Sequence, residues 1–374
     1  TMELQVFEGF TPINGGVCAA KGFRANGVCC GLTHEASHGN PADDAKKKND
    51  LAVIYAERPC TAAAVYTTNK VKGAPILVTQ AHLQSGTAQA VIVNSVNANT
   101  CNADGVEKAL TMCRLTADAL KLPVSEVIVA STGVIGQVLP IEPIQKAIPA
   151  LCEGLSDTGN EAALEAIMTT DTMKKQLAIE FKLGGKFCRI GGMLKGSGMI
   201  HPNMATTLTF ITTDAAISAA MLQQALSDII PRTLHRVSVD GDTSPNDMVS
   251  VLASGLAGNA TIKSEAADYE IFKQALYIIL LNLGRMMARD GEGATKLITC
   301  ICNQAKSEQD AELVAKSVIT SSLFKSAMFG EDANWGRILC AVGYSGASFE
   351  VGKVDVSLAS TAGKIAVCRG GVGV

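Results

Sequence analysis

An H-E-x-x-H motif lies near the N-terminus, with the spacing at which peptidases bind zinc through two histidines. It is formed by His34, Glu35 and His38, and Glu57 follows close to where such enzymes take a third zinc ligand. The motif needs a continuous helix to bring both imidazoles to one face, whereas the Gly-Asn-Pro sequence at 39–41 ends any helix at once. We therefore expect two solvated loop histidines and no metal site, which leaves a zinc peptidase as the last of the functions considered.

A glycine-rich segment in the middle of the chain is the second candidate. Residues 191–203 read GGMLKGSGMIHPN, and an apolar strand follows closely. Glycines at this density indicate a backbone that bends sharply or comes close to another group. The chain has only five histidines and contains no G-x-S-x-G or G-x-x-x-x-G-K motif. An acyl-transfer enzyme built on this sequence would therefore need another base than the histidine of a conventional triad.

The composition narrows the class of protein. The 374 residues are 47% hydrophobic and 18% charged, enough for one large globular body or two medium domains. A net charge of −3 and 4% aromatic residues favour no nucleic acid partner, because phosphates need a basic surface and bases need rings to stack on. No apolar run reaches the ~18 residues of a membrane span and no cationic leader precedes an apolar core, so we expect a cytoplasmic protein without a membrane partner. The 12 cysteines lack C-x-x-C spacing, which favours reduced thiols.

Short apolar runs alternate with amphipathic stretches along the chain, which predicts an α/β protein. Strands rich in valine and isoleucine are expected at 51–57, 90–95, 126–131, 207–212, 296–303 and 349–357. Helices with apolar residues three and four apart are expected at 105–122, 141–151, 160–176, 216–230, 265–289 and 310–326. A polar segment at 33–50 is expected to be a surface loop.

The segment KGSGMIHPNMATTLTFITTDA at 195–215 closely resembles the self-processing segment of the ornithine acetyltransferase family, the ArgJ-type enzymes of arginine biosynthesis. Further blocks resemble the family in the same order: NSVNANTCNADG at 94–105, ASTGVIGQVLP at 130–140, MTTDT at 168–172, VDGDTSPND at 239–247, ARDGEGATKLIT at 288–299 and FGEDANWGRILCAVGYSG at 329–346. The resemblance covers nearly the whole chain. It implies a layered α/β sandwich of the type shared by ornithine acetyltransferases and self-cleaving aminopeptidases.

The resemblance implies that the precursor cuts itself between Ala205 and Thr206. An α chain of residues 1–205 and a β chain of residues 206–374 would then stay associated, and two such pairs would form an α2β2 heterotetramer. A free α-amino group has an ordinary pKa of about 7.7 to 8.0, so the amine of Thr206 can take the proton of its own hydroxyl at neutral pH. Thr206 would thus be the nucleophile and would carry its own base.

The resemblance also assigns five further residues. By motif position, Thr132 and Gly133 stabilise the oxyanion of the tetrahedral intermediate. Thr169, Lys195 and Glu292 contact the substrate, together with the nucleophile itself. Lys195 suits a carboxylate and Glu292 an ammonium group. From the residues alone, a turn at a strand end and two surface charges remain as alternatives.

Two departures from the family pattern accompany these assignments. Thr207 follows the nucleophile where methionine is usual, and strand alternation would send its hydroxyl to the opposite face. Relatives continue beyond Cys368–Val374 through a segment whose Asn and Thr complete the substrate site, so we expect those contacts to come from a C-terminal segment outside this sequence. No role is assigned to four residues of matching blocks: Asp240, Asp242, Asn334 and Trp335.

The function implied by the resemblance is transfer of an acetyl group from N-acetylornithine to glutamate, giving ornithine and N-acetylglutamate, through an acetyl-threonine enzyme. No cofactor is expected, and acetyl-CoA as a second acetyl donor stays open. One alternative is a related self-cleaving aminopeptidase with an N-terminal nucleophile, which would use serine where this chain has Thr206. Another alternative is an amino-acid-binding protein without catalysis.

Overall fold

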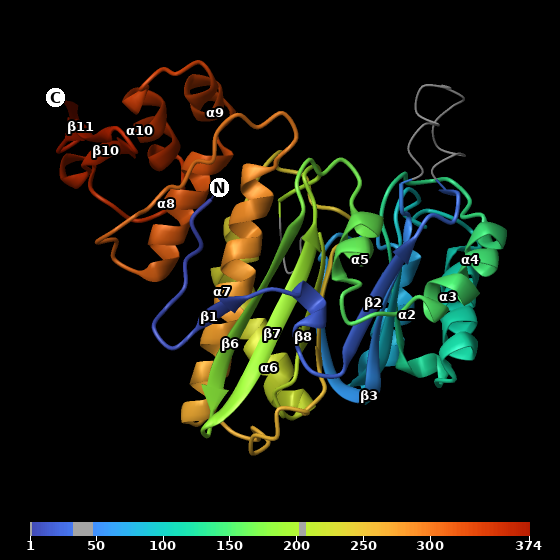
Figure 1. Cartoon of the computed structure of the whole chain (residues 1–374). Coiled ribbons are helices and arrows are strands. Elements are labelled where there is room, and N and C mark those ends of the chain that lie inside the picture. The colour runs from blue at the N-terminus through green and yellow to red at the C-terminus, as the bar shows by residue number, and fades with distance from the viewer. Residues whose placement is uncertain (1, 33–47, 202–206) are drawn as a thin grey trace. The chain divides into compact units, whose positions relative to one another are not determined.

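The computed structural model describes residues 2–32, 48–201 and 207–374 (Figure 1). Two units divide the chain. Unit 1 comprises Thr1–Val237 and Asp242–Glu292, and unit 2 comprises Ser238–Gly241 and Gly293–Val374.

Unit 1 is built on a nine-stranded sheet. Its strands are β1 (Thr11–Ile13), β2 (Phe23–Val28), β3 (Leu51–Tyr66), β4 (Thr87–Asn94), β5 (Val127–Ser131), β6 (Lys175–Leu183), β7 (Lys186–Lys195), β8 (Leu208–Thr213) and β9 (Met248–Ala253). The order across the sheet is β1-β6-β7-β8-β9-β3-β4-β5, and β2 pairs with β3. β8 pairs antiparallel with β7 and parallel with β9. The strand that follows the glycine-rich segment therefore lies in the middle of the sheet.

Both faces of this sheet are apolar. Successive side chains of a strand point to opposite faces, so consecutive apolar residues cover both of them. On β4, Val91 and Val93 join one buried cluster, and Ala90 and Ile92 join another. The sequence expectation of a half-buried strand thus becomes a strand buried on both faces, which needs cover on each side.

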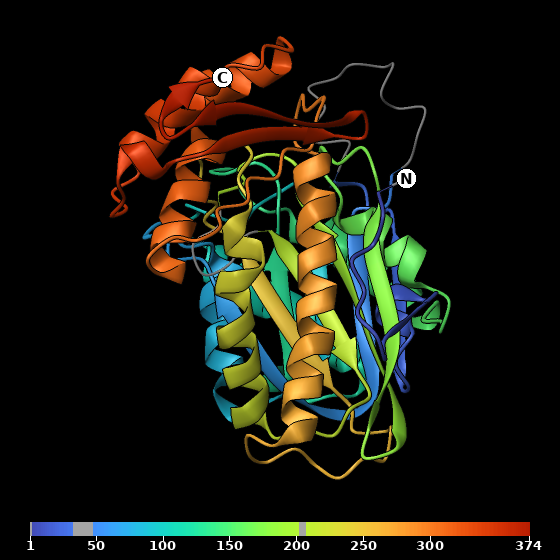
Figure 2. The same cartoon turned by 90° about the vertical axis from the view of Figure 1, so that its left-hand side faces the viewer.

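Helices provide that cover. They are α2 (Ala74–His82), α3 (Gly105–Leu120), α4 (Ile141–Glu153), α5 (Asn160–Ile167), α6 (Ala219–Ile229) and α7 (Ala267–Arg289). Side chains of α5 belong to the first cluster, and side chains of α3 and α4 belong to the second. Figure 2 shows α6 and α7 lying side by side along the sheet, where α7 packs on β6 and β7. The layered α/β arrangement expected from the sequence is confirmed in this unit.

Helix α7 also has the length and hydropathy of a membrane span. However, 56% of its most apolar window is buried inside the protein. Its side chains explain why: Ile279 and Leu283 pack against the backbone of Gly192 on β7. α7 is therefore the core helix of unit 1.

Unit 2 contains three helices and a small sheet. The helices are α8 (Glu308–Thr320), α9 (Ser322–Phe329) and α10 (Trp335–Gly343), and the strands are β10 (Val356–Ser360), β11 (Gly363–Arg369) and β12 (Val372–Gly373) in an antiparallel sheet. Its apolar cluster is small and centres on Val318, Phe324 and Ile338.

Most predicted elements of unit 1 are confirmed, and three predictions are corrected. The expected helix 160–176 ends at Ile167, and the chain then turns into β6. The expected helix 310–326 is two helices, because Ser321 ends α8 and its hydroxyl accepts the Phe324 N–H at the start of α9. The expected strand 296–303 is irregular and unpaired in the described chain, and Ile301 is 74% exposed.

The remaining differences are smaller. The expected strand 349–357 is displaced, because a short helical turn occupies Val351–Lys353 and β10 begins only at Val356. All 12 cysteines are free thiols, as their scattered spacing predicts.

Candidate functional site

The glycine-rich segment connects β7 to β8 at the middle of the sheet. Lys195 is the last residue of β7, and Thr207 immediately precedes β8. Ala205 and Thr206 lie outside the described residues, as do His34, Glu35 and His38 of the zinc-like motif. Glu57, the third residue proposed for that motif, is exposed within β3.

Thr132 and Gly133 follow the end of β5. The Thr132 N–H donates to the carbonyl oxygen of Asn94 at 3.1 Å, which continues the pairing of β5 with β4. Gly133 has a φ of +131°, and a Cβ there would overlap the backbone carbonyl of Val96. Glycine is thus required at this position by packing, independently of any role toward an oxyanion.

Lys195 is buried and touches Thr132. Its Nζ donates to the Thr132 Oγ1 at 3.2 Å, and the side chains come from β7 and from the turn after β5. Burial lowers the pKa of the Lys195 ammonium, while the carboxylates of Asp171 and Asp247 oppose that shift. The contact brings together an expected oxyanion donor and an expected substrate contact that are 63 residues apart in sequence.

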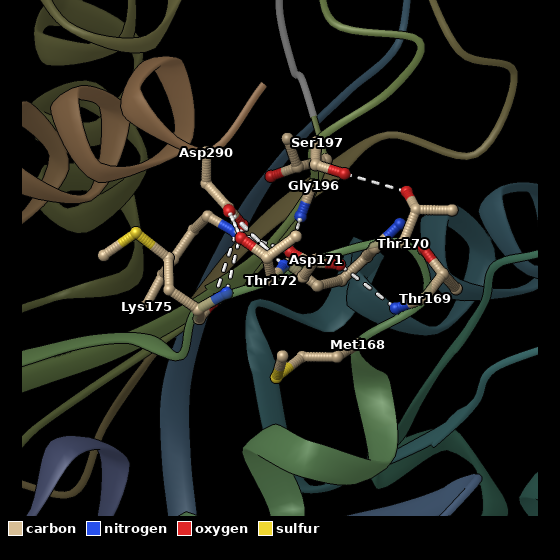
Figure 3. A network of polar contacts seen from close by, with 12 residues as sticks. Met168, Thr169, Thr170, Asp171, Thr172, Lys175, Gly196, Ser197 and Asp290 are labelled. Carbon is tan, nitrogen blue, oxygen red and sulfur yellow. Dashed lines mark hydrogen bonds and ion pairs between the residues drawn. The ribbon is translucent and has the colours of Figure 1, made fainter. Parts of the chain in front are cut away.

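Asp171 organises the backbone around these residues (Figure 3). Its carboxylate accepts the Gly196 N–H at 2.7 Å and the Thr169 N–H at 3.0 Å, and pairs with the Lys175 ammonium at 2.7 Å. Burial alone would raise the pKa of Asp171, but the charges of Lys175 and Lys195 outweigh it, and the pKa lies below its ordinary value. One ionised carboxylate therefore fixes the segments that carry Thr169 and Lys195.

A second carboxylate completes this buried network. Asp290 pairs with Lys175 and accepts the backbone N–H and the hydroxyl of Thr172. Lys175 is fully buried between Asp171 and Asp290, as Figure 3 shows. A buried ammonium ion is tolerated only when it is paired and hydrogen-bonded, and here both conditions are met. The network ties the start of β6 to the end of α7.

Glu292 lies just beyond that network. Its Oε1 accepts the Thr170 hydroxyl at 2.6 Å, and its N–H donates to the Ser197 carbonyl oxygen at 2.9 Å. The hydroxyls of Thr170 and Ser197 are 2.8 Å apart, as drawn in Figure 3. The glycine-rich segment is thereby attached to both Thr170 and Glu292.

Asp247 is a site residue that sequence reasoning missed. It is 3% exposed, its Oδ1 accepts the Thr207 N–H at 2.7 Å, and burial raises its pKa to about 8. Only its place at the end of the VDGDTSPND block could have drawn attention to it, since the contact partner is 40 residues away in sequence.

Thr207 differs from its prediction. β8 begins one residue later than expected, and Thr207 itself has a φ of +89°, so simple strand alternation does not describe it. Its hydroxyl is buried, 2.9 Å from the hydroxyl of Thr209. Gly196 packs against it, and a Cβ on Gly196 would lie 2.6 Å from the Thr207 methyl carbon.

Comparison with known proteins identifies one family. A family model described as the ArgJ family matches residues 37–374. The chain is similar to the arginine biosynthesis bifunctional protein ArgJ 1 of Clostridium acetobutylicum, with 48% identity over 94% of this chain and 84% of that protein. It is 50% identical to the ArgJ protein of Symbiobacterium thermophilum over 92% of this chain and 84% of that one. Among solved structures, an ornithine acetyltransferase of Mycobacterium tuberculosis complexed with ornithine is 34% identical, with a TM-score of 0.46, over 52% of this chain and 100% of that chain.

Proposed function

The chain belongs to the ArgJ family, whose members are acyltransferases of arginine biosynthesis, and from that premise we propose that it cuts itself before Thr206 and uses Thr206 to carry an acetyl group. The donor is N-acetylornithine and the acceptor is glutamate. Ornithine and N-acetylglutamate are the products.

The contact between Lys195 and Thr132 is the observation that carries this proposal. The two residues come from separate segments, and their polar atoms lie 3.2 Å apart. Lys195 ends β7 and pairs with Leu208, the first residue of β8, so the contact lies where the two strands on either side of the proposed cut meet. A buried cation next to a hydroxyl supports a site where negative charge develops or is bound.

Self-cleavage needs only the chain and water. The Thr206 hydroxyl oxygen bonds to the Ala205 carbonyl carbon, the peptide C–N bond breaks, and the hydroxyl proton passes to the leaving nitrogen. Water then hydrolyses the ester, which leaves the Ala205 carboxylate and a Thr206 with a free amine and hydroxyl. That amine is the base that the remaining chemistry requires.

Acetyl transfer follows the same path twice. The Thr206 oxygen attacks the acetyl carbon while the amine takes its proton, and Thr132 and Gly133 stabilise the oxyanion. The C–N bond breaks and the proton passes to the leaving nitrogen, so ornithine departs and an acetyl ester stays on Thr206. The amine of glutamate then attacks this ester, and N-acetylglutamate leaves with the Thr206 hydroxyl restored.

Lys195, Thr169 and Glu292 are proposed to select the amino acids. Lys195 pairs with a substrate carboxylate, Glu292 with an ammonium group, and Thr169 hydrogen-bonds either. Asp171 supports this assignment because it holds the Thr169 N–H and the Gly196 N–H at once.

The sheet order supports lasting association of the α and β chains. β8 and β9 of the proposed β chain lie between β7 and β3 of the proposed α chain, hydrogen-bonded to both. We propose that two such αβ pairs assemble as α2β2, that the reaction takes place in the cytoplasm, and that it needs no metal or cofactor. Acetyl-CoA stays open as a second donor of the acetyl group.

An aminopeptidase is disfavoured because the position after the cut is threonine rather than serine. An amino-acid-binding protein would leave the precursor whole. Intact mass under denaturing conditions separates these functions: the wild-type chain should give two pieces, the smaller beginning at Thr206, and Thr206→Ala should give one. A smaller piece with any other N-terminus would overturn the mechanism.

The covalent intermediate is tested with N-acetylornithine alone. The β chain should gain one acetyl group on Thr206 and release ornithine without glutamate, and added glutamate should then remove the acetyl group. Because the two half-reactions are separate, double-reciprocal plots of rate against one substrate, at several fixed concentrations of the other, should give parallel lines. Thr132→Ala should slow transfer about a hundredfold, whereas Glu292→Ala should weaken substrate use more than chain cleavage. Intersecting lines, or an acetyl group on another residue, would show direct transfer instead.

A further inference from the structure

Thr207 holds a backbone conformation that is unusual for a β-branched residue. Its φ of +89° lies in the left-handed region that residues with a Cβ avoid. The Thr207 N–H donates to the Asp247 Oδ1 at 2.7 Å, and the Thr207 carbonyl oxygen accepts the Met248 N–H at 2.8 Å. Strain of this kind persists where the surrounding structure over-determines it, and it gathers at functional sites.

The carboxyl of Asp247 is only partly used by this contact. Its side chain is buried, and its Oδ2 has no partner at hydrogen-bond distance among the described residues, while the N–H and hydroxyl of Ser244 favour the charged form of the carboxyl. The ammonium group of Lys195 is the charged group that acts on it. Burying a carboxyl costs stability even with these contacts, and an apolar side chain would avoid that cost. The presence of Asp247 therefore indicates a use beyond packing.

The accepted N–H belongs to the peptide group that joins Thr206 to Thr207. A peptide group is planar and includes the Cα atoms on both sides. A carboxyl that holds this plane therefore restricts where the Thr206 Cα can lie, and both the hydroxyl side chain and the nitrogen at the cut are bonded to that atom. The cut lies on the other side of Thr206, so the contact can act before and after cleavage.

We propose that Asp247 is a positioning residue for Thr206, which aligns the nucleophile by holding the Thr207 N–H in self-cleavage and again in acetyl transfer. The inference rests on the proposed function, because it takes Thr206 as the nucleophile. It assigns no bond-making step to Asp247, whose carboxyl stays hydrogen-bonded throughout.

The test compares three variants made by cell-free synthesis, with cleavage followed over time by denaturing mass spectrometry. Asp247→Ala removes the acceptor and should slow cleavage about a hundredfold, the usual cost of a misplaced reacting group. Asp247→Asn keeps an oxygen that accepts the N–H and should stay within about tenfold of the wild type. The matched control is Asp214→Ala, since Asp214 is equally buried and accepts backbone N–H groups at the other end of β8. It should cleave at nearly the wild-type rate.

A second measurement covers the case in which Asp247→Ala does not fold, as its thermal melting curve would reveal. Asp247→Asn matures, and its kcat for acetyl transfer should fall severalfold while the KM for N-acetylornithine stays unchanged. The kcat is expressed per active molecule, counted as chains that gain an acetyl group from N-acetylornithine alone, because inactive chains would lower the apparent kcat without changing KM. A changed KM with an unchanged kcat would place Asp247 in substrate binding and overturn the proposal.

The outcomes separate the two proposals. A wild-type chain that stays whole contradicts the proposed function and removes the basis of this inference. A wild type that cleaves, with Asp247→Ala equally fast, overturns only the inference. Equal slowing by Asp214→Ala would assign the effect to general stability, and an Asp247→Asn as slow as Asp247→Ala would show that the accepted N–H is not what matters.

Discussion

The two ends of strand β8 each hold a buried aspartate that accepts a backbone N–H, and they use it differently. At the far end, both oxygens of Asp214 are satisfied, by the Arg189 N–H at 2.7 Å and the Lys21 N–H at 3.0 Å, and neither of these two donor residues has a positive φ. At the near end, the Asp247 Oδ1 accepts the N–H of Thr207, which has a φ of +89°. The same residue type thus closes a strand at one end and maintains strain at the other, beside the proposed nucleophile.

Burial alone therefore does not distinguish a structural carboxyl from a functional one. Both side chains are buried, and burial raises the pKa of both. The distinguishing feature is the strained backbone of Thr207, of a kind that natural structures retain where function requires it.

Replacing Thr207 should have the largest effect on this contrast. Thr207→Pro removes the N–H that Asp247 accepts and sets φ near −65°, so we expect cleavage to slow about a thousandfold, or ~4 kcal/mol in the barrier. Thr207→Gly keeps the N–H and adopts a positive φ without strain, so it should cleave within about tenfold of the wild type. Cleavage is measured by denaturing mass spectrometry over time. Similar rates for the two variants would mean that the backbone of Thr207 is irrelevant.

Removing the cation beside Asp247 should have the next largest effect. Lys195→Met loses a charged hydrogen bond to Thr132 and the proposed carboxylate partner, worth about 1.5–3 kcal/mol, so kcat/KM for N-acetylornithine should fall roughly 10- to 150-fold. The rate of chain cleavage should fall by a smaller factor. The matched change at the far end is Arg189→Met, which removes a charge near Asp214 and should leave kcat/KM nearly unchanged. Equal losses in both variants would contradict the difference between the two ends.

The pH dependence of stability should distinguish the ends more finely. Asp247 has its pKa raised to about 8 in the folded chain, above an unfolded value of about 3.9, so the folded state keeps an extra proton between these values. Stability should therefore fall as pH rises through this window, by at most ~1.4 kcal/mol per pH unit. The experiment uses the Thr206→Ala variant, which should stay one chain, and measures its free energy of unfolding in urea at several pH values. Adding Asp247→Asn should make this free energy fall less as the pH rises.

Asp214→Asn is the control for that experiment. Its raised pKa gives a fall of the same sign, but two accepted N–H groups favour the ionised form and should make the flattening smaller. A larger flattening at Asp214 would reverse the assignment of the two aspartates.

The smallest effect is expected far from β8, in the zinc-like motif. Because the Gly-Asn-Pro sequence at 39–41 ends any helix, the sequence predicts no tight zinc, so replacing His34 and His38 together by alanine should leave cleavage and acetyl transfer nearly unchanged. Metal analysis and both assays check this. Stoichiometric zinc that disappears together with activity in the double variant would restore the peptidase hypothesis.

Local sequence patterns predicted the elements whose buried residues recur with a regular period. They failed where the formation of a strand depends on a neighbouring strand to pair with. Val91 and Val93 of the expected strand 90–95 share one buried face, and the buried residues of the expected helix 105–122, such as Ala109, Met112 and Cys113, recur three and four residues apart; both elements formed. The segment 296–303 has a similar composition but finds no strand to pair with in the described chain, and a strand is stable only in a ladder.

The site was predictable where a motif carried it and not where two distant segments meet. Thr132, Lys195 and Glu292 were nominated by resemblance, and the structure brings the first two into contact. The strain at Thr207 and the role of Asp247 depend on the parallel pairing of β8 with β9, which no local pattern announces.

Under the proposed function, the position of β8 and β9 turns self-cleavage into a checkpoint for folding. These two strands fill the middle of the sheet, between β7 and β3, which precede the junction in the chain. Residues 1–205 alone would leave a gap two strands wide, with hydrogen-bonding groups exposed on both sides of it. If the cut depends on Asp247 at the start of β9, it can occur only after this gap has closed. A processed molecule therefore carries a covalent record that its sheet was completed, and unprocessed chains mark the molecules that failed to fold.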